Sequence, residues 1–158
     1  MYWITLFQQN KNNMEYRINI AKLEPESYKA MLGLEKYLQN TQLNKMHKEL
    51  IKIRASQING CAYCINMHTK DARKYGETEQ RIYLLNAWKE TTLFTVEERA
   101  ILAITEEVTL ISKSGLSQET YQNALKLFNE NQVAEIIMAV VTINAWNRIA
   151  IATQMQPE

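Results

Sequence analysis

The stretch at residues 49–75 reads ELIKIRASQINGCAYCINMHTKDARKY, and it holds both cysteines of the chain and one of its two histidines. Cys61, Cys64 and His68 stand at positions i, i+3 and i+7, which fall within one stripe of an α-helix. A helix here therefore predicts two thiols and an imidazole on one face. Redox thiol chemistry needs these groups: a nucleophile, a resolving partner and a titratable neighbour.

The residues before the cysteines predict a second, antiparallel helix. Residues 44–56 repeat apolar side chains at helical spacing, and Asn59-Gly60 is a strong turn signal directly before the cysteine pair. Two helices joined at this turn form an αα-hairpin. Glu49 lies ten positions before Asn59 and His68 nine positions after it. Equal rise per residue then places the carboxylate level with the imidazole, near a helix N-terminus whose dipole favours a thiolate.

The rest of the chain carries helical signals and no alternating strand pattern. Only two prolines and four glycines interrupt 158 residues. Thr95 and Glu98 form a capping-box pattern. The expected helices span residues 25–40, 44–56, 61–76, 78–88, 95–111 and 117–128, with a last helix from about residue 131. We therefore expect an all-α fold, a compact helical bundle.

Length and charge limit the classes of protein. A chain of 158 residues is long enough for one domain that buries about 70% of its unfolded-chain surface. We expect that domain at residues 14–158, preceded by a Gln/Asn-rich extension at residues 1–13. The 18 basic and 17 acidic residues are scattered rather than clustered, which argues against a nucleic-acid partner.

The last predicted helix is apolar nearly all round, which is typical of a helix buried centrally or in a subunit interface. Its most apolar run, residues 136–143, is far shorter than the ~20 residues that span a bilayer. No targeting signal is recognisable either, so we expect a soluble, cytoplasmic protein with no membrane contact. Asn144, Asn147 and Arg148 need hydrogen-bond partners if they are buried there. They support either the site or an interface.

The pattern Glu49-x11-Cys61-x2-Cys64-x3-His68 resembles the active-site signature of AhpD-like alkylhydroperoxidases, within the carboxymuconolactone decarboxylase superfamily. The resemblance extends over RASQINGCAYCINMHTKDARKYGETEQRIYLLNAW and over the later segment INAWNRIAI. A bare C-x-x-C is a weak signal, whereas the four spaced residues together are specific.

This resemblance implies a homo-oligomer, trimeric or hexameric, with thiol peroxidase activity on alkyl hydroperoxides or hydrogen peroxide and with no metal or bound cofactor. By the same resemblance, Cys64 is the peroxidatic thiol, Cys61 the resolving thiol, and Glu49 and His68 the proton relay. A thiol reductant, such as a dihydrolipoyl protein or a thioredoxin-like donor, completes the cycle. Tyr63 stands where well-characterised members have a histidine, and it serves either as a nearby hydroxyl or in packing.

Three other functions fit the same residues. The pair suits a dithiol–disulfide oxidoreductase or redox sensor that acts on a protein partner. It also suits a zinc site, in which Cys61, Cys64 and His68 are joined by Glu49 or by His47. We expect His47 on a different side of its helix from Glu49. The helical scaffold without active thiols would be an oligomeric binding module.

Overall fold

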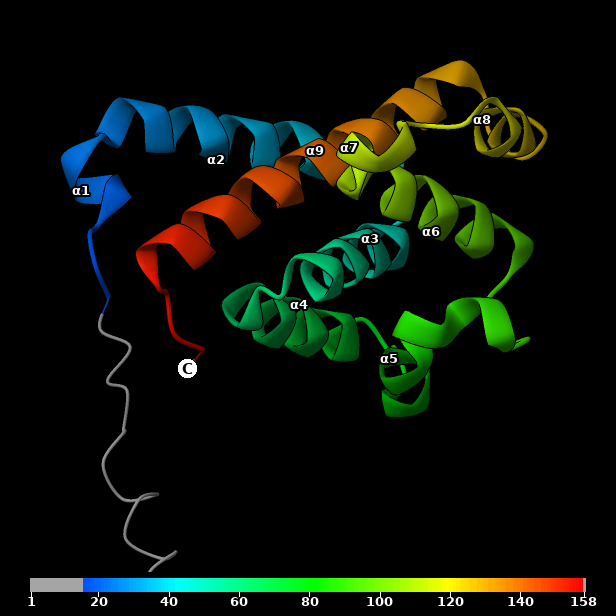
Figure 1. The fold of residues 1–158 in the computed structure, drawn as a ribbon, viewed down its shortest axis with the longest axis horizontal. Coiled ribbons are helices and arrows are strands. Elements are labelled where there is room, and N and C mark those ends of the chain that lie inside the picture. The colour runs from blue at the N-terminus through cyan, green and yellow to red at the C-terminus, as the bar shows by residue number, and fades with distance from the viewer. Residues whose placement is uncertain (1–15, 158) are drawn as a thin grey trace, which may run out of the picture.

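The computed structural model describes residues 16–157, and every regular element in that range is helical (Figure 1). In chain order these are α1 (Ile20–Leu23), α2 (Pro25–Gln39), α3 (Lys45–Asn59), α4 (Ala62–Lys74), α5 (Glu79–Leu84), the 3₁₀ helix η1 (Leu85–Glu90), α6 (Val96–Thr109), α7 (Ile111–Ser114), α8 (Gln118–Leu125) and α9 (Glu130–Thr153). The all-α prediction is confirmed. The predicted extension at residues 1–13 lies outside the described residues.

Helix α3 lies at the centre of the molecule and packs against α4, α6 and α9. In Figure 1, α2 and α9 run above it, and α4 and α5 lie below it. One buried apolar set includes Ile51, Ile101, Ile104, Ile136 and Ile143. The other includes Leu50, Ile53, Leu85, Trp88 and Leu102. Apart from Lys45, every residue of α3 is buried or half-buried, so the side chains that α3 contributes to a site are held by packing.

The predicted turn between α3 and α4 is confirmed, with a small shift in the helix boundary. Gly60 follows α3 with φ 71°, a left-handed conformation that glycine adopts without a steric penalty. Cys61 comes next with φ −86° and ψ 93°, and it is the N-cap of α4 rather than part of its first turn. The cysteine helix therefore begins one position later than the predicted range, at Ala62.

Two further helix starts follow from capping side chains. The predicted capping box of α6 is confirmed, because Glu98 N–H donates to Thr95 Oγ1 at 3.2 Å and Thr95 N–H donates to Glu98 Oε2 at 2.8 Å. A second capping box starts α9 at Asn129. Ser117 caps α8 as predicted, but that helix is shorter than expected and ends at Leu125.

The single helix predicted over residues 78–88 is wrong. The α-helix gives way to η1, within which Ala87 has a non-helical backbone (φ −114°, ψ 26°). The guanidinium of Arg99, on α6, donates to the carbonyls of Trp88 and Thr91 at 2.9 Å each. These tertiary hydrogen bonds replace the local helical ladder, and local sequence patterns do not report them.

The predicted extension of α6 as far as Ile111 is also wrong. The helix ends at Thr109, and Ile111 lies exposed in α7. The Glu107 carboxylate accepts from Ser117 N–H and from the Thr120 hydroxyl, both at 2.7 Å. These bonds tie the start of α8 to α6, so the chain must leave α6 early in order to return.

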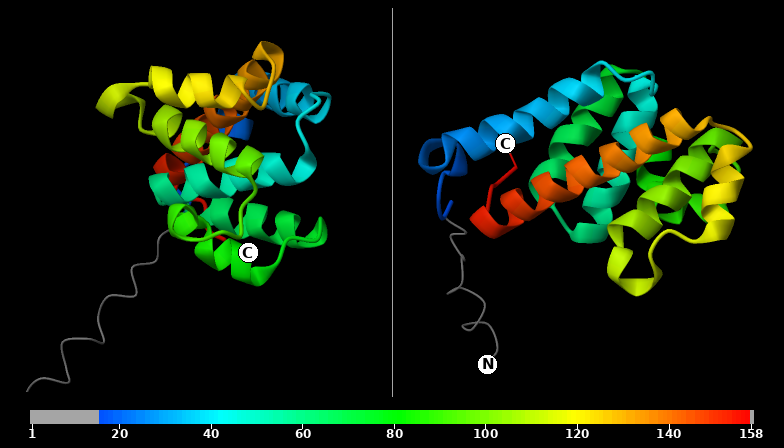
Figure 2. Two further views of the ribbon diagram at one scale, coloured as in Figure 1. Left: turned by 90° about the vertical axis from the view of Figure 1, so that its right-hand side faces the viewer. Right: turned by 90° about the horizontal axis from the view of Figure 1, so that it is seen from above.

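Helix α9 crosses the molecule beside α2 (Figure 2). By length and composition alone, α9 could cross a bilayer. The prediction considered only the apolar run at residues 136–143, which is too short to do so, and did not anticipate this. Half of its apolar window is buried inside the molecule, and α9 packs against α2, α3, α6 and α8. This fits a helix buried in the core, one of the two places predicted for it, and the described residues form a compact helical bundle.

Candidate active site

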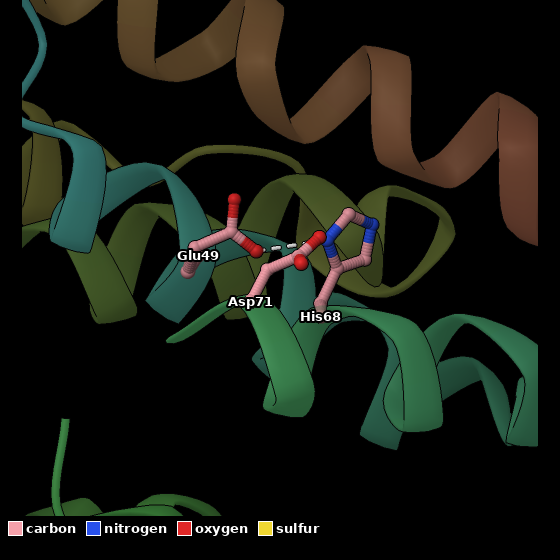
Figure 3. Close-up of side chains that lie close together, drawn as sticks. All are labelled: Glu49, His68 and Asp71. Atoms are coloured by element: carbon pink, nitrogen blue, oxygen red, sulfur yellow. Dashed lines mark hydrogen bonds and ion pairs between the residues drawn. The ribbon is translucent and has the colours of Figure 1, made fainter. Parts of the chain in front are cut away.

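The α3–α4 hairpin brings Glu49 and His68 face to face (Figure 3). His68 Nδ1 lies 2.8 Å from Glu49 Oε2, and both side chains are buried. The predicted alignment of these residues across the hairpin is confirmed. An ionised Glu49 only accepts hydrogen bonds, so the proton lies on Nδ1 and the other ring nitrogen, Nε2, is left as an acceptor. In Figure 3, Nε2 points away from the carboxylates.

The two thiols meet at the N-terminal end of α4. Cys61 Sγ and Cys64 Sγ lie 2.6 Å apart, and both thiols are free. Cys61 is 1% exposed and Cys64 is 2% exposed. Because Cys61 precedes the helix as its N-cap, only Cys64 and His68 lie on successive turns of α4 itself. A pair this close exchanges a proton directly between its sulfurs.

The negative charge of the pair falls on Cys61. The hydrogen bond from the Cys64 thiol lowers the pKa of Cys61 to about 7, against the opposing effect of burial. The Cys64 backbone N–H and the Asn147 side chain contribute to this value as well, each by lowering the pKa of Cys61. Such donors at a helix N-terminus stabilise a thiolate.

Cys64 retains the shared proton. Its pKa is raised by the hydrogen bond with Cys61, by burial and by the negative charge that Cys61 carries. Asn147 acts in the opposite direction on this thiol too, because its side-chain hydrogen bond lowers the pKa of Cys64. The first proton that the reduced pair loses therefore leaves from Cys61, and the two thiols titrate as a unit.

A cavity of about 320 Å³, here called the thiol cavity, opens onto Cys64 and His68. Its apolar wall consists of Tyr28, Leu32, Met67, Trp146, Ala150 and Met155, and its polar wall of Glu35, Lys52, Tyr63 and Asp71. Cys61 is not part of the lining. Cys64, which retains the shared proton, is thus the cysteine that lines the cavity. Tyr63 lines the cavity and also packs against the core.

A second cavity, of about 460 Å³, lies on the Glu49 side of the imidazole. Its lining includes Lys45, Lys48 and Lys52 together with Glu49 and Asp71. His68 lines both cavities. The Glu49–His68 couple therefore stands between the two spaces, where it can pass a proton from one to the other.

Glu49, His68 and Asp71 form the group of described residues best placed to hold a metal ion (Figure 3). They offer one ligand atom each, and these atoms lie within 4.8 Å of one another. Lys52 Nζ already lies 4.0 Å from Glu49 Oε1, which supplies a positive charge beside that carboxylate. The thiols do not join this group, so the four-ligand zinc alternative is not assembled in the described chain. His47 instead faces charged groups of α5 and α6, as expected.

Sequence reasoning missed several neighbours of the site. Asp71 follows His68 by three positions and Lys52 follows Glu49 by three, so helical spacing alone could have found both. Asn147 was left between two roles; its side chain hydrogen-bonds Ser56 and Asn59, and it lowers the pKa of both cysteines. Since it comes from α9, no local spacing connects it with the thiols.

The sequence profile of the carboxymuconolactone decarboxylase family matches residues 25–107, a range that includes all four predicted site residues. YdfG, an uncharacterized protein of Bacillus subtilis (strain 168), is 45% identical over 139 residues, which are 88% of this chain and 95% of YdfG.

Two solved structures share the fold. A protein of unknown function from Agrobacterium tumefaciens, described as a candidate antioxidant defence protein AhpD, matches with a TM-score of 0.88 and 40% identity over 91% of this chain and 99% of its own. An uncharacterized peroxidase-related protein from Silicibacter sp. TM1040 matches with a TM-score of 0.75 and 25% identity over 85% of this chain and 71% of its own.

Proposed function

This chain belongs to the carboxymuconolactone decarboxylase family as an AhpD-like member, and we propose that it is a thiol-dependent peroxidase that reduces alkyl hydroperoxides or hydrogen peroxide. One observation carries the proposal: of two free thiols 2.6 Å apart, Cys64 lines a cavity shared with His68, which is paired with Glu49. This arrangement supplies the nucleophile, the resolving thiol and the acid–base group that peroxide reduction needs.

The first step forms a thiolate that faces the substrate. The pair gives one proton to His68 Nε2, and the resulting imidazolium is stabilised by Glu49. The remaining proton moves from Cys64 to Cys61 across 2.6 Å. Cys64 is then the thiolate, and it is the sulfur that lines the thiol cavity.

The second step breaks the peroxide bond. Cys64 Sγ attacks the terminal, hydrogen-bearing oxygen of the hydroperoxide, and the O–O bonding pair leaves with the other oxygen. That oxygen takes the proton from His68 Nε2 and departs as an alcohol, or as water when the substrate is hydrogen peroxide. Cys64 becomes a sulfenic acid, and His68 returns to its neutral form.

The third step forms the disulfide. Cys61 Sγ attacks Cys64 Sγ, the S–O bond breaks, and the hydroxyl leaves as water with the Cys61 proton. Because the two sulfurs are already adjacent, this reaction competes well with further oxidation of the sulfenic acid. The sum is two thiols and one hydroperoxide giving one disulfide, one alcohol and one water.

The disulfide is then reduced by a thiol donor. Both sulfurs are buried, and the route to them is the thiol cavity, which suits a slender dithiol such as a dihydrolipoyl arm better than the folded surface of a protein. We place this cycle in a homo-oligomer, a trimer or hexamer, as the family resemblance implies, and in the cytoplasm, as we expect from the sequence.

The second candidate is a dithiol–disulfide oxidoreductase or redox sensor with a protein partner. The free thiol pair and the Cys61 pKa of about 7 favour it as much as they favour the peroxidase. The burial of both sulfurs argues against this candidate. In thiol–disulfide exchange the thiolate must reach a sulfur of the partner's disulfide directly, and the surface of a folded protein has poor access to buried sulfurs.

Stopped-flow oxidation separates these candidates. Reduced protein is mixed with hydrogen peroxide, with tert-butyl hydroperoxide, and with an oxidised thioredoxin-like protein, and disulfide formation is followed by mass. The peroxidase predicts one hydroperoxide consumed per chain and a disulfide between Cys61 and Cys64. The Cys61→Ser, Cys64→Ser double variant is the background control. Fast oxidation by the protein disulfide with no response to either peroxide would favour the oxidoreductase instead.

A further inference from the structure

Tyr28, on α2, stands between two cavities of different chemistry. On one side is the thiol cavity, which Cys64 and His68 line. On the other side is a cavity of about 570 Å³, here called the outer cavity. Residues of α1, α2 and α9 line the outer cavity, and apart from one serine hydroxyl their side chains are apolar. Among the described residues, Tyr28 alone lines both cavities.

The helical repeat of α2 explains this arrangement. Tyr28, Leu32 and Glu35 stand at positions i, i+4 and i+7 of the helix, and all three line the thiol cavity. The neighbouring stripe of the same helix, which includes Met31 and Leu34, lines the outer cavity. The two cavities therefore lie on adjacent faces of α2, and Tyr28 is at the boundary between them.

The ring of Tyr28 is held at this boundary by Trp146 of α9. The two ring centroids lie 5.3 Å apart and the ring planes are 73° apart, which is an edge-to-face contact. Aromatic pairs prefer this geometry, and both side chains are half-buried. Trp146 also lines the thiol cavity, whereas Ile149, on the next turn of α9, lines the outer cavity. The aromatic pair thus forms a wall where α2 and α9 meet.

We infer that Tyr28 is a specificity-determining residue, whose ring closes the thiol cavity toward the outer cavity and selects hydroperoxides with a compact apolar group, branched or aromatic. This inference rests on the function proposed above. The thiol cavity, at about 320 Å³, lies at the lower end of the roughly 300–1,000 Å³ that ligand sites span. While the ring stands in place, the further methylenes of a long linear chain gain no burial in the outer cavity.

The test uses straight-chain primary alcohols, which resemble the product and contain no peroxide. In a Cys61→Ser parent protein Cys64 is the only thiol, and an alcohol in the thiol cavity should protect it from iodoacetamide. The concentration for half-protection should fall with each methylene until the chain fills the cavity, and then fall no further. In Tyr28→Ala the decrease should continue over about two or three more methylenes, by about fourfold each, the usual gain for a buried methylene.

Three further variants of the same parent serve as controls, and circular dichroism checks that each is folded. Tyr28→Phe keeps the ring and should keep the chain-length limit. Tyr28→Leu should extend the limit by less than Tyr28→Ala, and it decides the matter if the alanine variant does not fold. Tyr37→Ala is the matched control, because Tyr37 is on the same helix, is 44% exposed and lines neither cavity. It should leave the limit in place.

The inference is overturned if Tyr28→Ala and Tyr28→Leu keep the limit of the parent, if Tyr37→Ala moves it as far, or if alcohols of every length protect Cys64 equally. Oxidation by straight-chain primary hydroperoxides should show the same change of limit. A protein that ignores every hydroperoxide while the alcohol limit moves would refute the proposed peroxidase function and leave the role of Tyr28 standing. Reduction of hydroperoxides with an unmoved limit would refute the role of Tyr28 alone.

Discussion

His68 Nδ1 and Glu49 Oε2 lie 2.8 Å apart in residues that are 19 positions apart in the sequence, on opposite arms of the hairpin that turns at Gly60. This bond fixes the tautomer and the orientation of the imidazole, in the way that a carboxylate orients a general base. Lys52 Nζ lies 4.0 Å from the other Glu49 oxygen and places a positive charge beside the carboxylate. The pair is thus prepared to take a proton at Nε2 and return it.

Glu49→Gln should slow peroxide reduction by about 10²-fold or more, the usual scale for a lost acid–base group, with the fold intact. The neutral amide no longer places a negative charge against the imidazole, so the proposed proton relay loses its partner. Single-turnover oxidation of the reduced variant measures the effect. Glu98→Gln is the matched control, because that carboxylate is similarly buried but is paired with Arg81. The control should lose stability and keep the oxidation rate, and a normal rate in Glu49→Gln would remove Glu49 from the mechanism.

The hairpin was predictable because its determinants are local. The rise per residue is a backbone constant, so a turn at Asn59-Gly60 was enough to set Glu49 level with His68. The capping box at Thr95 is equally local. Where the prediction failed, the cause was a distant residue. Arg99 binds the carbonyl of Trp88, at the end of the expected helix, and that of Thr91 beyond it, and Glu107 ties the start of α8 back to α6.

The distribution of charge in the site could not be read from the sequence for the same reason. Spacing brings Cys61 and Cys64 together, but the pKa of each thiol depends on which donors surround it. One donor is a backbone N–H of α4 and another is Asn147, which is more than 80 positions from either cysteine in the chain. The thiol cavity likewise joins residues of α2, α4 and α9.

In solution the protein should be a homo-oligomer. Large apolar side chains remain exposed on the described chain, among them Leu23, Leu32, Tyr37, Met67, Val141 and Ile151. A subunit contact would cover side chains of this kind. Multi-angle light scattering at micromolar concentration should give a multiple of the 18.5 kDa chain mass. A mass of one chain across the concentration range would contradict this prediction.

The pKa values of the two thiols should move in opposite directions when either partner is removed. In Cys64→Ala the pKa of Cys61 should rise from about 7, because the hydrogen bond from the Cys64 thiol is its largest stabilising contact. In Cys61→Ala the pKa of Cys64 should fall, because the negative neighbour that opposes its ionisation is gone. Thiolate absorbance as a function of pH measures both variants. Parallel shifts would mean that the thiols do not share a proton.

The last prediction concerns which sulfur attacks the peroxide. Charge favours Cys61, whose pKa is lowered to about 7, whereas access favours Cys64, which lines the thiol cavity with His68. A proton can pass between sulfurs that lie 2.6 Å apart, so we expect access to decide and Cys64 to be the peroxidatic thiol.

Cys61→Ser should therefore accumulate a sulfenic acid on Cys64, which a dimedone-type reagent traps and peptide mass locates. Cys64→Ser should give no trapped adduct, since Cys61 does not line the cavity. Alkylation of the remaining thiol in each variant, without peroxide, is the control for the reactivity of that thiol. An adduct on Cys61 in Cys64→Ser would reverse the two roles. It would also mean that the peroxide reaches the pair from the N-terminal end of α4 rather than through the thiol cavity.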